Sequence, residues 1–239
     1  MESNEVIKVN DLDLKDTSFI CIASKRMSGK SVLTKNLIMY LLNKFEYKFV
    51  VLFSDTAKFN GDYDFLKHKD MIYESDQMDS KIPKILNLQK QRNKKLKNKV
   101  HGLIILDDVK LYTTSKPLVD LASKGRHYKL TVIVSVQFPK TLISPAIRSN
   151  IDYLFWSDLN ETGLKAVYES ITIKQSFKNF VQFVEEHNHS YQFMFFNGKE
   201  NDKTKRFKIV IFMTFIFIPF MFSWNLYGHF TIKQEYFKI

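Results

Sequence analysis

Three residues near the amino terminus, Gly29, Lys30 and Ser31, have the types and the order needed to bind a nucleoside triphosphate. They follow an apolar run at 19–22 that reads as a β-strand, and they precede a stretch at 32–42 with helical apolar spacing. A tight loop at a helix start directs backbone N–H groups at phosphates, a lysine reaches the β- and γ-phosphates, and a hydroxyl binds Mg²⁺. The sequence therefore predicts a P-loop that takes ATP and Mg²⁺ as cofactors.

The predicted P-loop departs from the pattern G-x-x-x-x-G-K-[ST] at one position. Ser24 stands where the first glycine is expected. A small residue can take the bend required there, so we expect the loop to form; an ordinary strand-to-helix turn is the alternative. The predicted nucleotide-binding residues are consecutive: Ser24, Lys25, Arg26, Met27, Ser28, Gly29, Lys30, Ser31 and Val32.

Two further apolar runs end in polar side chains that suit phosphate chemistry. The run at 102–106 ends in Asp107 and Asp108, and the run at 131–136 ends at Gln137. Near a P-loop, one strand-end carboxylate organises Mg²⁺ and a second polarises the attacking water. We therefore assign Asp107, with Ser31, to the metal, Asp108 to the general base, and Gln137 to the γ-phosphate or the lytic water. The alternative is a solvated acidic pair and a loop glutamine.

The elements that must position these residues alternate between strand and helix. This alternation is typical of an α/β fold with a mainly parallel central sheet flanked by helices. The expected strands lie at 17–22, 48–53, 71–73, 102–106, 131–136, 153–156 and 192–196, and the expected helices at 31–43, 82–96, 118–123, 161–169 and 174–186.

Length and composition fit one such domain with a tail. The chain has 239 residues, of which 45% are hydrophobic, and a net charge of +11. That charge favours an anionic partner, either a polynucleotide or a membrane face. The single cysteine, Cys21, excludes an intramolecular disulfide and fits a reducing compartment. The amino terminus lacks the pattern of a secretory signal, so secretion is not expected.

The most basic stretch of the chain coincides with the expected helix at 82–96. Its lysines and arginine could contact DNA phosphates, or they could form a solvated helix face, and the sequence leaves both readings open. The basic residues are Lys90, Arg92, Lys94, Lys95, Lys97 and Lys99.

Composition changes abruptly near the carboxyl terminus. We divide the chain into an N-terminal extension (1–16), a P-loop ATPase domain (17–200) and a basic hinge with an apolar tail (201–239). Residues 209–227 carry no charge, and their number is close to the roughly 20 needed to cross a bilayer core. Basic residues before this run would place that flank on the cytoplasmic side. A membrane anchor, a strand of the central sheet with an apolar continuation, and a frameshifted terminus are the three readings.

Taken together, these motifs resemble the genome-packaging ATPases of large DNA viruses and their virophage and transposon relatives, in the FtsK/HerA superfamily. The resemblance rests on the P-loop, the run into Asp107 and Asp108, and above all the stretch 125–150, and it covers roughly residues 18–196. It implies a RecA-like P-loop fold of the ASCE type. It also implies that Arg126 is an arginine finger reaching a neighbour's nucleotide, with Arg148 as the second candidate. A surface salt bridge is the alternative for either arginine.

The same resemblance implies an ATP-driven translocase of double-stranded DNA that loads a viral genome into a capsid. The implied partners are double-stranded DNA, copies of the chain in a ring, usually a hexamer, and a viral capsid or an internal membrane. The implied location is the host cytoplasm, in a viral factory, or the virion. Two other functions stay open: a small-molecule phosphotransferase similar to nucleoside kinases, and a membrane-bound scaffold whose nucleotide site has decayed.

Overall fold

The computed structural model describes residues 5–66, 71–97, 100–109, 116–139, 144–171, 173–187, 189 and 191–212. Nine strands form a single sheet in the order β1-β9-β8-β7-β2-β6-β5-β3-β4. Eight of them run parallel, and β8 is antiparallel to both of its neighbours. The strands are β1 (Val6–Lys8), β2 (Phe19–Ser24), β3 (Phe49–Phe53), β4 (Ile72–Tyr73), β5 (Gly102–Asp107), β6 (Leu130–Val136), β7 (Tyr153–Ser157), β8 (Gln192–Asn197) and β9 (Phe207–Ile211).

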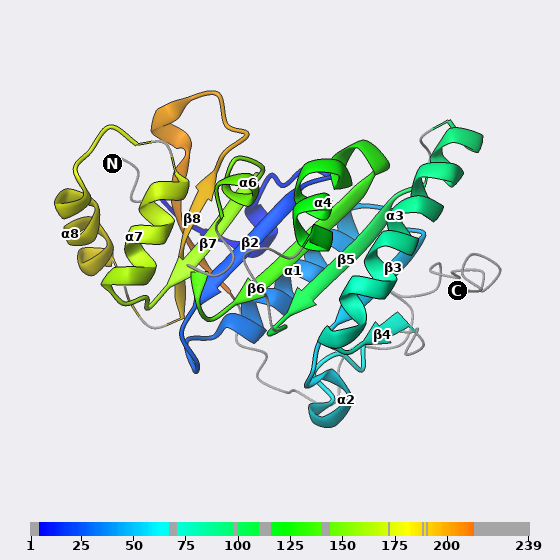
Figure 1. Cartoon of the computed structure of the whole chain (residues 1–239). Helices are drawn as coiled ribbons and strands as arrows, with labels where there is room; N and C mark the ends of the chain where they lie inside the picture. Colours follow the sequence, from blue (N-terminus) through cyan, green and yellow to red (C-terminus); the bar gives the residue numbers. More distant parts are fainter. Residues whose placement is uncertain are drawn as a thin grey trace.

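Helices cover both faces of the sheet. Figure 1 shows α3, α4, α7 and α8 in front of the sheet and α1 behind it. The α-helices are α1 (Lys30–Lys44), α2 (Ala57–Asn60), α3 (Met78–Lys95), α4 (Lys116–Lys124), α6 (Pro145–Arg148), α7 (Glu161–Ser170) and α8 (Phe177–His187). Short 3-10 helices include η1 (Val9–Asp11) and η4 (Gly125–Tyr128). The α/β class predicted from the alternation of elements is confirmed.

The central strands are buried because each supplies apolar side chains to both layers of helices. In β2, Phe19 and Cys21 belong to the core beneath α3, α4, α7 and α8, whereas Ile20 and Ile22 belong to the core beneath α1. A continuous apolar run is what a strand covered on both faces requires. This is why β2, β5 and β6 were recognisable as uninterrupted apolar segments.

The parallel register brings the polar strand ends to one edge of the sheet. Ala23 of β2 pairs with Val136 of β6, and Asp107 of β5 pairs with Ser135 of β6. The residues that follow these three strands must therefore lie side by side at this edge, which we call the carboxyl edge. The opposite edge, where the parallel strands begin, is the amino edge.

The sheet extends beyond the predicted 17–200 domain on both sides. β9 pairs with β8 and with β1, and Leu12 and Leu14 of the predicted N-terminal extension are buried. Residues 209–211 of the candidate membrane segment are therefore part of a strand, as one of the three readings of the tail required. The rest of that segment, 213–227, lies outside the described residues. Among the described residues, no helix is both long and apolar enough to cross a bilayer.

Candidate active site

The predicted P-loop forms the connection between β2 and α1. Its last residue, Gly29, has φ +88° and caps the amino end of α1. Positive φ is accessible to glycine at little cost because glycine has no Cβ. The first helical hydrogen bond runs from the Leu33 N–H to the Gly29 carbonyl, so the N–H groups of Lys30, Ser31 and Val32 have no partner within the helix. Such free N–H groups at a helix start are suited to phosphate oxygens.

Ser24 takes the place of the first glycine without opening the loop. It is the last residue of β2 and is fully buried. The Ser28 hydroxyl lies 2.7 Å from the Ser24 hydroxyl and 2.8 Å from the Lys25 carbonyl oxygen, so the loop is closed across its base. Lys25 also pairs with Asp158, which follows β7, at 2.8 Å. These contacts hold the loop from two neighbouring strands.

A phenylalanine packs directly against the glycine of the loop. A Cβ added to Gly29 would lie 2.6 Å from Cζ of Phe212, which follows β9. The Phe212 ring is itself packed against Phe193, with ring centroids 5.8 Å apart. The end of β9 therefore supports the P-loop from the α1 side of the sheet, a role that the loop motif does not reveal.

Lys30, Asp108 and Gln137 form one connected group at the carboxyl edge. Lys30 Nζ donates to Asp108 Oδ1 at 2.6 Å, and Gln137 Nε2 lies 3.0 and 2.9 Å from the two Asp108 oxygens. Asp108 has φ +53°, and Lys30 is 6% exposed. The Lys30 ammonium is thus paired with the Asp108 carboxylate, at the position where it could instead pair with phosphate oxygens. Three residues predicted from three separate elements meet, although their roles stay predictions.

Asp107 occupies a different environment from Asp108. Its Oδ2 accepts a hydrogen bond of 2.6 Å from the Tyr63 hydroxyl, whereas its buried Oδ1 has no hydrogen-bond partner in the described part of the chain. Burial first, and then the negative charge of Asp107, raise the pKa of the Tyr63 phenol, so the hydroxyl stays protonated and donates. An unpaired buried carboxylate oxygen is costly unless it has a ligand. Together with the exposed Ser31 hydroxyl, it gives the oxygen donors that Mg²⁺ prefers.

The two predicted arginines do not lie in this group. Arg126 is exposed in η4, just before β6, whereas Gln137 follows β6. β6 has seven residues, so the two ends are separated by roughly 20 Å at about 3.3 Å per residue. Within the described ranges, the Arg126 guanidinium forms no hydrogen bond or ion pair. Arg148, in α6 at the same amino edge, pairs with Glu169 at 3.3 Å. Neither arginine is placed to reach the nucleotide of its own chain.

Replacing Gly29 with alanine is expected to destabilise the fold and weaken nucleotide binding. A non-glycine residue in the left-handed region costs roughly 1–2 kcal/mol, and the new methyl group would clash with Phe212. For a chain of this size, each kcal/mol lowers Tm by roughly 2–4 °C. Thermal unfolding measures the effect. Gly125→Ala is the matched control, because its Cβ would meet nothing nearer than 3.7 Å. Equal losses in both variants would contradict the conclusion that position 29 specifically requires glycine.

A protein-family model and two curated proteins match this chain. The family model, described as Poxvirus A32 protein, matches residues 7–195. An uncharacterized protein of Invertebrate iridescent virus 6 is 33% identical over 156 residues, which cover 63% of this chain and 58% of that protein. An uncharacterized protein of Acanthamoeba polyphaga mimivirus is 29% identical over 171 residues, with 65% and 57% covered. The chain spans less than three fifths of the length of these relatives.

Solved structures share the fold at low sequence identity. The DNA-packaging ATPase B204 from Sulfolobus turreted icosahedral virus has a TM-score of 0.59 and 18% identity, covering 84% of this chain and 100% of that chain. The genome packaging NTPase B204 from Sulfolobus turreted icosahedral virus 2, in complex with ATP-gammaS, has a TM-score of 0.56 and 17% identity, covering 82% and 97%. This likeness confirms the predicted P-loop fold.

Proposed function

The chain belongs to the poxvirus A32 protein family, and we propose that it hydrolyses ATP to move double-stranded DNA, packaging a viral genome into a capsid. The resemblance to viral packaging ATPases that the motifs indicated is confirmed by this family match and by the fold shared with B204. The observation that carries the proposed activity is the meeting of Lys30, Asp108 and Gln137 beside the P-loop.

In the proposed reaction, each residue acts on a different part of the triphosphate. The free N–H groups at the start of α1 and the Lys30 ammonium bind the phosphate oxygens. Asp108 accepts the proton of the attacking water, and Gln137, already hydrogen-bonded to Asp108, orients that water against the γ-phosphate. The Asp107 Oδ1 and the Ser31 hydroxyl would hold Mg²⁺, which neutralises charge on the β- and γ-phosphates when bound.

The geometry favours an active enzyme over a scaffold with a decayed site. A decayed site has no reason to keep a lysine, a carboxylate and an amide within hydrogen-bond distance, and here they remain so. A nucleoside kinase would instead need an acceptor pocket and arginines over its own phosphates. Arg126 and Arg148 lie at the amino edge, which suits action on a neighbouring copy in a ring.

An ATPase assay with and without duplex DNA tests the proposed function. We expect turnover that requires Mg²⁺ and rises when linear duplex is added. Turnover that depends on a small phosphate acceptor would indicate a phosphotransferase. Nucleotide binding without turnover under any condition would indicate a scaffold.

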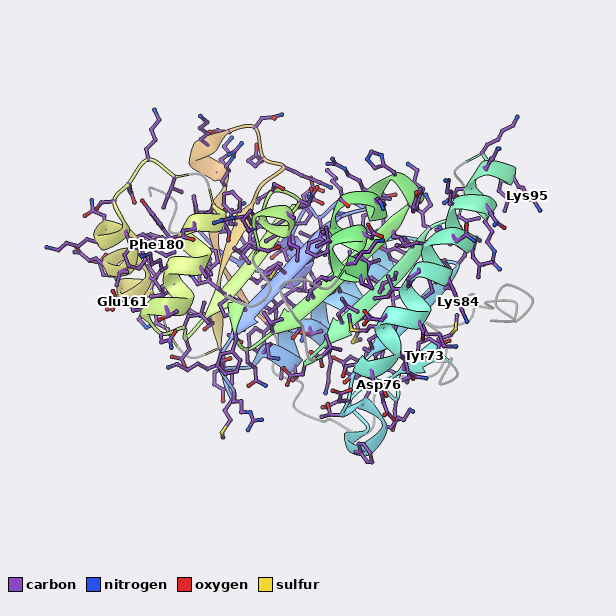
Figure 2. The ribbon with its side chains drawn as sticks, in the orientation of Figure 1. Tyr73, Asp76, Lys84, Lys95, Glu161 and Phe180 are labelled. Atoms are coloured by element: carbon purple, nitrogen blue, oxygen red, sulfur yellow. The ribbon has the colours of Figure 1, made fainter. Side chains whose placement is uncertain are left out.

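Helix α3 is the surface that we propose for contact with DNA phosphates. Its apolar side packs on the sheet through Ile82 and Ile85, and Asn93 Nδ2 donates to the Tyr128 carbonyl of η4 at 2.9 Å. In Figure 2, Lys95 lies at the end of α3 that projects past the sheet, and Asp76 lies near the opposite end. The basic end of α3 is therefore at the amino edge, away from the nucleotide site.

Replacing Lys94, Lys95 and Lys97 with glutamine is expected to reduce the salt dependence of duplex binding. All three side chains are exposed. Each phosphate contact contributes roughly 0.9 to the slope of log K against log salt, so the loss of three contacts should reduce the slope by roughly 3. Filter binding or anisotropy over a salt series measures it. The matched control replaces Lys165, Lys174 and Lys178, which are exposed on the α7 and α8 flank. An equal change in both variants would indicate that the basic end of α3 is a solvated surface that does not contact DNA specifically.

A further inference from the structure

Tyr63 connects Asp107, the proposed metal ligand, to a segment of the chain that belongs to none of the motifs described above. It lies between β3 and β4, 44 residues before Asp107 in the sequence, and is 2% exposed. Its hydroxyl donates to Asp107 Oδ2 at 2.6 Å, a length typical of a strong bond to a charged acceptor. The tyrosine therefore lies beside the proposed metal site and acts directly on one of its oxygen donors.

This hydrogen bond makes the two oxygens of Asp107 unequal. Oδ2 is occupied by the phenol, while Oδ1 is buried and has no partner among the described residues. The terminal torsion of an aspartate is broad and roughly two-fold, so an unrestrained carboxylate can exchange its oxygens or bind a cation through both. With Tyr63 in place, Oδ1 is the oxygen without a hydrogen bond, and it is the one that we expect to face a metal ion or a water molecule bound to it.

The segment that carries Tyr63 is bound to two elements of the nucleotide site, helix α1 and the end of strand β5. The preceding residue, Asp62, pairs with Lys35 of α1, the helix that begins at the P-loop. Gly61 has φ +65°, and its carbonyl accepts from the Asp64 N–H at 3.1 Å, which forms the turn that presents the tyrosine. Adjacent residues thus tie this segment to α1 and to the end of β5. The position of the phenol is fixed by the same framework that fixes the phosphate loop.

We propose that Tyr63 is a positioning residue that makes Asp107 a single-oxygen donor to Mg²⁺, an inference that rests on the proposed ATPase function. Partners outside the ligand set fix the orientation of the ligand, and their loss typically lowers metal affinity by about 10- to 100-fold. The Tyr63 hydroxyl donates to Asp107 and, among the described residues, forms no hydrogen bond with Lys30 or with the P-loop. Its loss should therefore affect the metal and leave the nucleotide unaffected.

The test compares nucleotide binding with and without the metal in the full-length protein. A fluorescent ATP analogue is titrated into the wild type and into Tyr63→Phe, once with EDTA and once with saturating Mg²⁺. The ratio of the two dissociation constants reports the contribution of the metal, since the linkage between metal and nucleotide is reciprocal. We expect unchanged binding in EDTA and a metal contribution reduced by about tenfold in Tyr63→Phe.

Tyr47→Phe is the matched control. Tyr47 is also 2% exposed in the same core, and its hydroxyl lies 2.9 Å from the Thr131 hydroxyl, away from the site. It should lose comparable stability in thermal unfolding and keep the full metal contribution. A metal contribution that is unchanged or larger in Tyr63→Phe would overturn the proposal. Failure of the wild type to bind the analogue in either condition would instead count against the proposed function itself.

Discussion

Replacing Lys30 with alanine is expected to weaken ATP binding by roughly 10- to 100-fold, because hydrogen bonds to charged groups contribute roughly 1.5–3 kcal/mol each. The loss should lie at the upper end of that range. Without the ammonium, Asp108, which now pairs with it at 2.6 Å, would remain as an uncompensated negative charge beside the phosphates. Turnover should also be low at saturating ATP, because the Lys30 ammonium would no longer stabilise the charge that develops on the phosphate oxygens in the transition state.

Asp108→Asn should separate binding from chemistry. Asparagine has nearly the same shape, can still accept from Gln137 through its oxygen, and removes a negative charge near the phosphates, so nucleotide affinity should be kept or slightly raised. It cannot take the proton of the attacking water. General-base catalysis typically contributes about 10²–10⁴-fold, and kcat should fall by that factor.

Titration with a fluorescent ATP analogue and steady-state turnover distinguish the two variants. Lys178→Ala and Asp79→Asn change the same residue types at exposed positions on α8 and α3 and should resemble the wild type in both assays. Unchanged turnover in Asp108→Asn would remove the base assignment. In that case the role would pass to another group, because Asp107 is held by Tyr63 and is mostly enclosed.

Much of the central sheet was predictable because its strands are long apolar runs that end in polar residues of the candidate active site. β2, β5 and β6 each lie within about two residues of the expected bounds. Their parallel direction then requires Lys30, Asp108 and Gln137 to meet at one edge, since each follows or ends a strand of the same orientation. The same rule places Arg126 at the other edge, because it precedes β6.

The contacts around this framework were not predictable from patterns. β1 has three residues, and β9 lies at the start of a longer apolar run in the sequence, so neither has the bounded alternation that marks a strand. For the second run, a strand of the central sheet was only one of three readings. Tyr63 is one of eleven tyrosines, and only a contact with Asp107 across 44 residues gives it a role. The packing of Phe212 on Gly29 is equally non-local. Local sequence specifies the phosphate loop and the strand ends, whereas tertiary pairing determines what supports them.

Replacing Arg126 with alanine is expected to reduce ATP turnover by about 10³–10⁵-fold if its guanidinium completes the site of a neighbouring copy. Three observations favour action in trans. The side chain is exposed, it has no partner within the described part of its own chain, and it lies at the amino edge, whereas the nucleotide site lies at the carboxyl edge. Head-to-tail association of copies brings these two edges together, and such contacts generate rings when the rotation closes.

The decisive experiment mixes Arg126→Ala subunits with Lys30→Ala subunits. Each is inactive alone, but an interface at which the first contributes its P-loop and the second its arginine contains a complete site. Activity should therefore return on mixing, in assemblies shown to exchange subunits. The sites that bind ATP in the mixture should have the same affinity as those of the Arg126→Ala subunits alone. Nucleotide affinity of Arg126→Ala alone should stay close to wild type, because the arginine acts on charge that develops in the transition state.

Arg148→Ala serves as the internal comparison for this experiment. Arg148 occupies the same edge but is engaged by Glu169, so its loss should cost mainly a partly exposed ion pair, worth no more than about 1 kcal/mol of stability, and leave most turnover intact. If Arg148→Ala is the variant that loses turnover and recovers on mixing, Arg148 is the arginine finger, and Arg126 is a surface residue without a role in hydrolysis. If neither variant recovers in exchanging assemblies, the site is completed within one chain, which would require movement of an arginine across the length of β6.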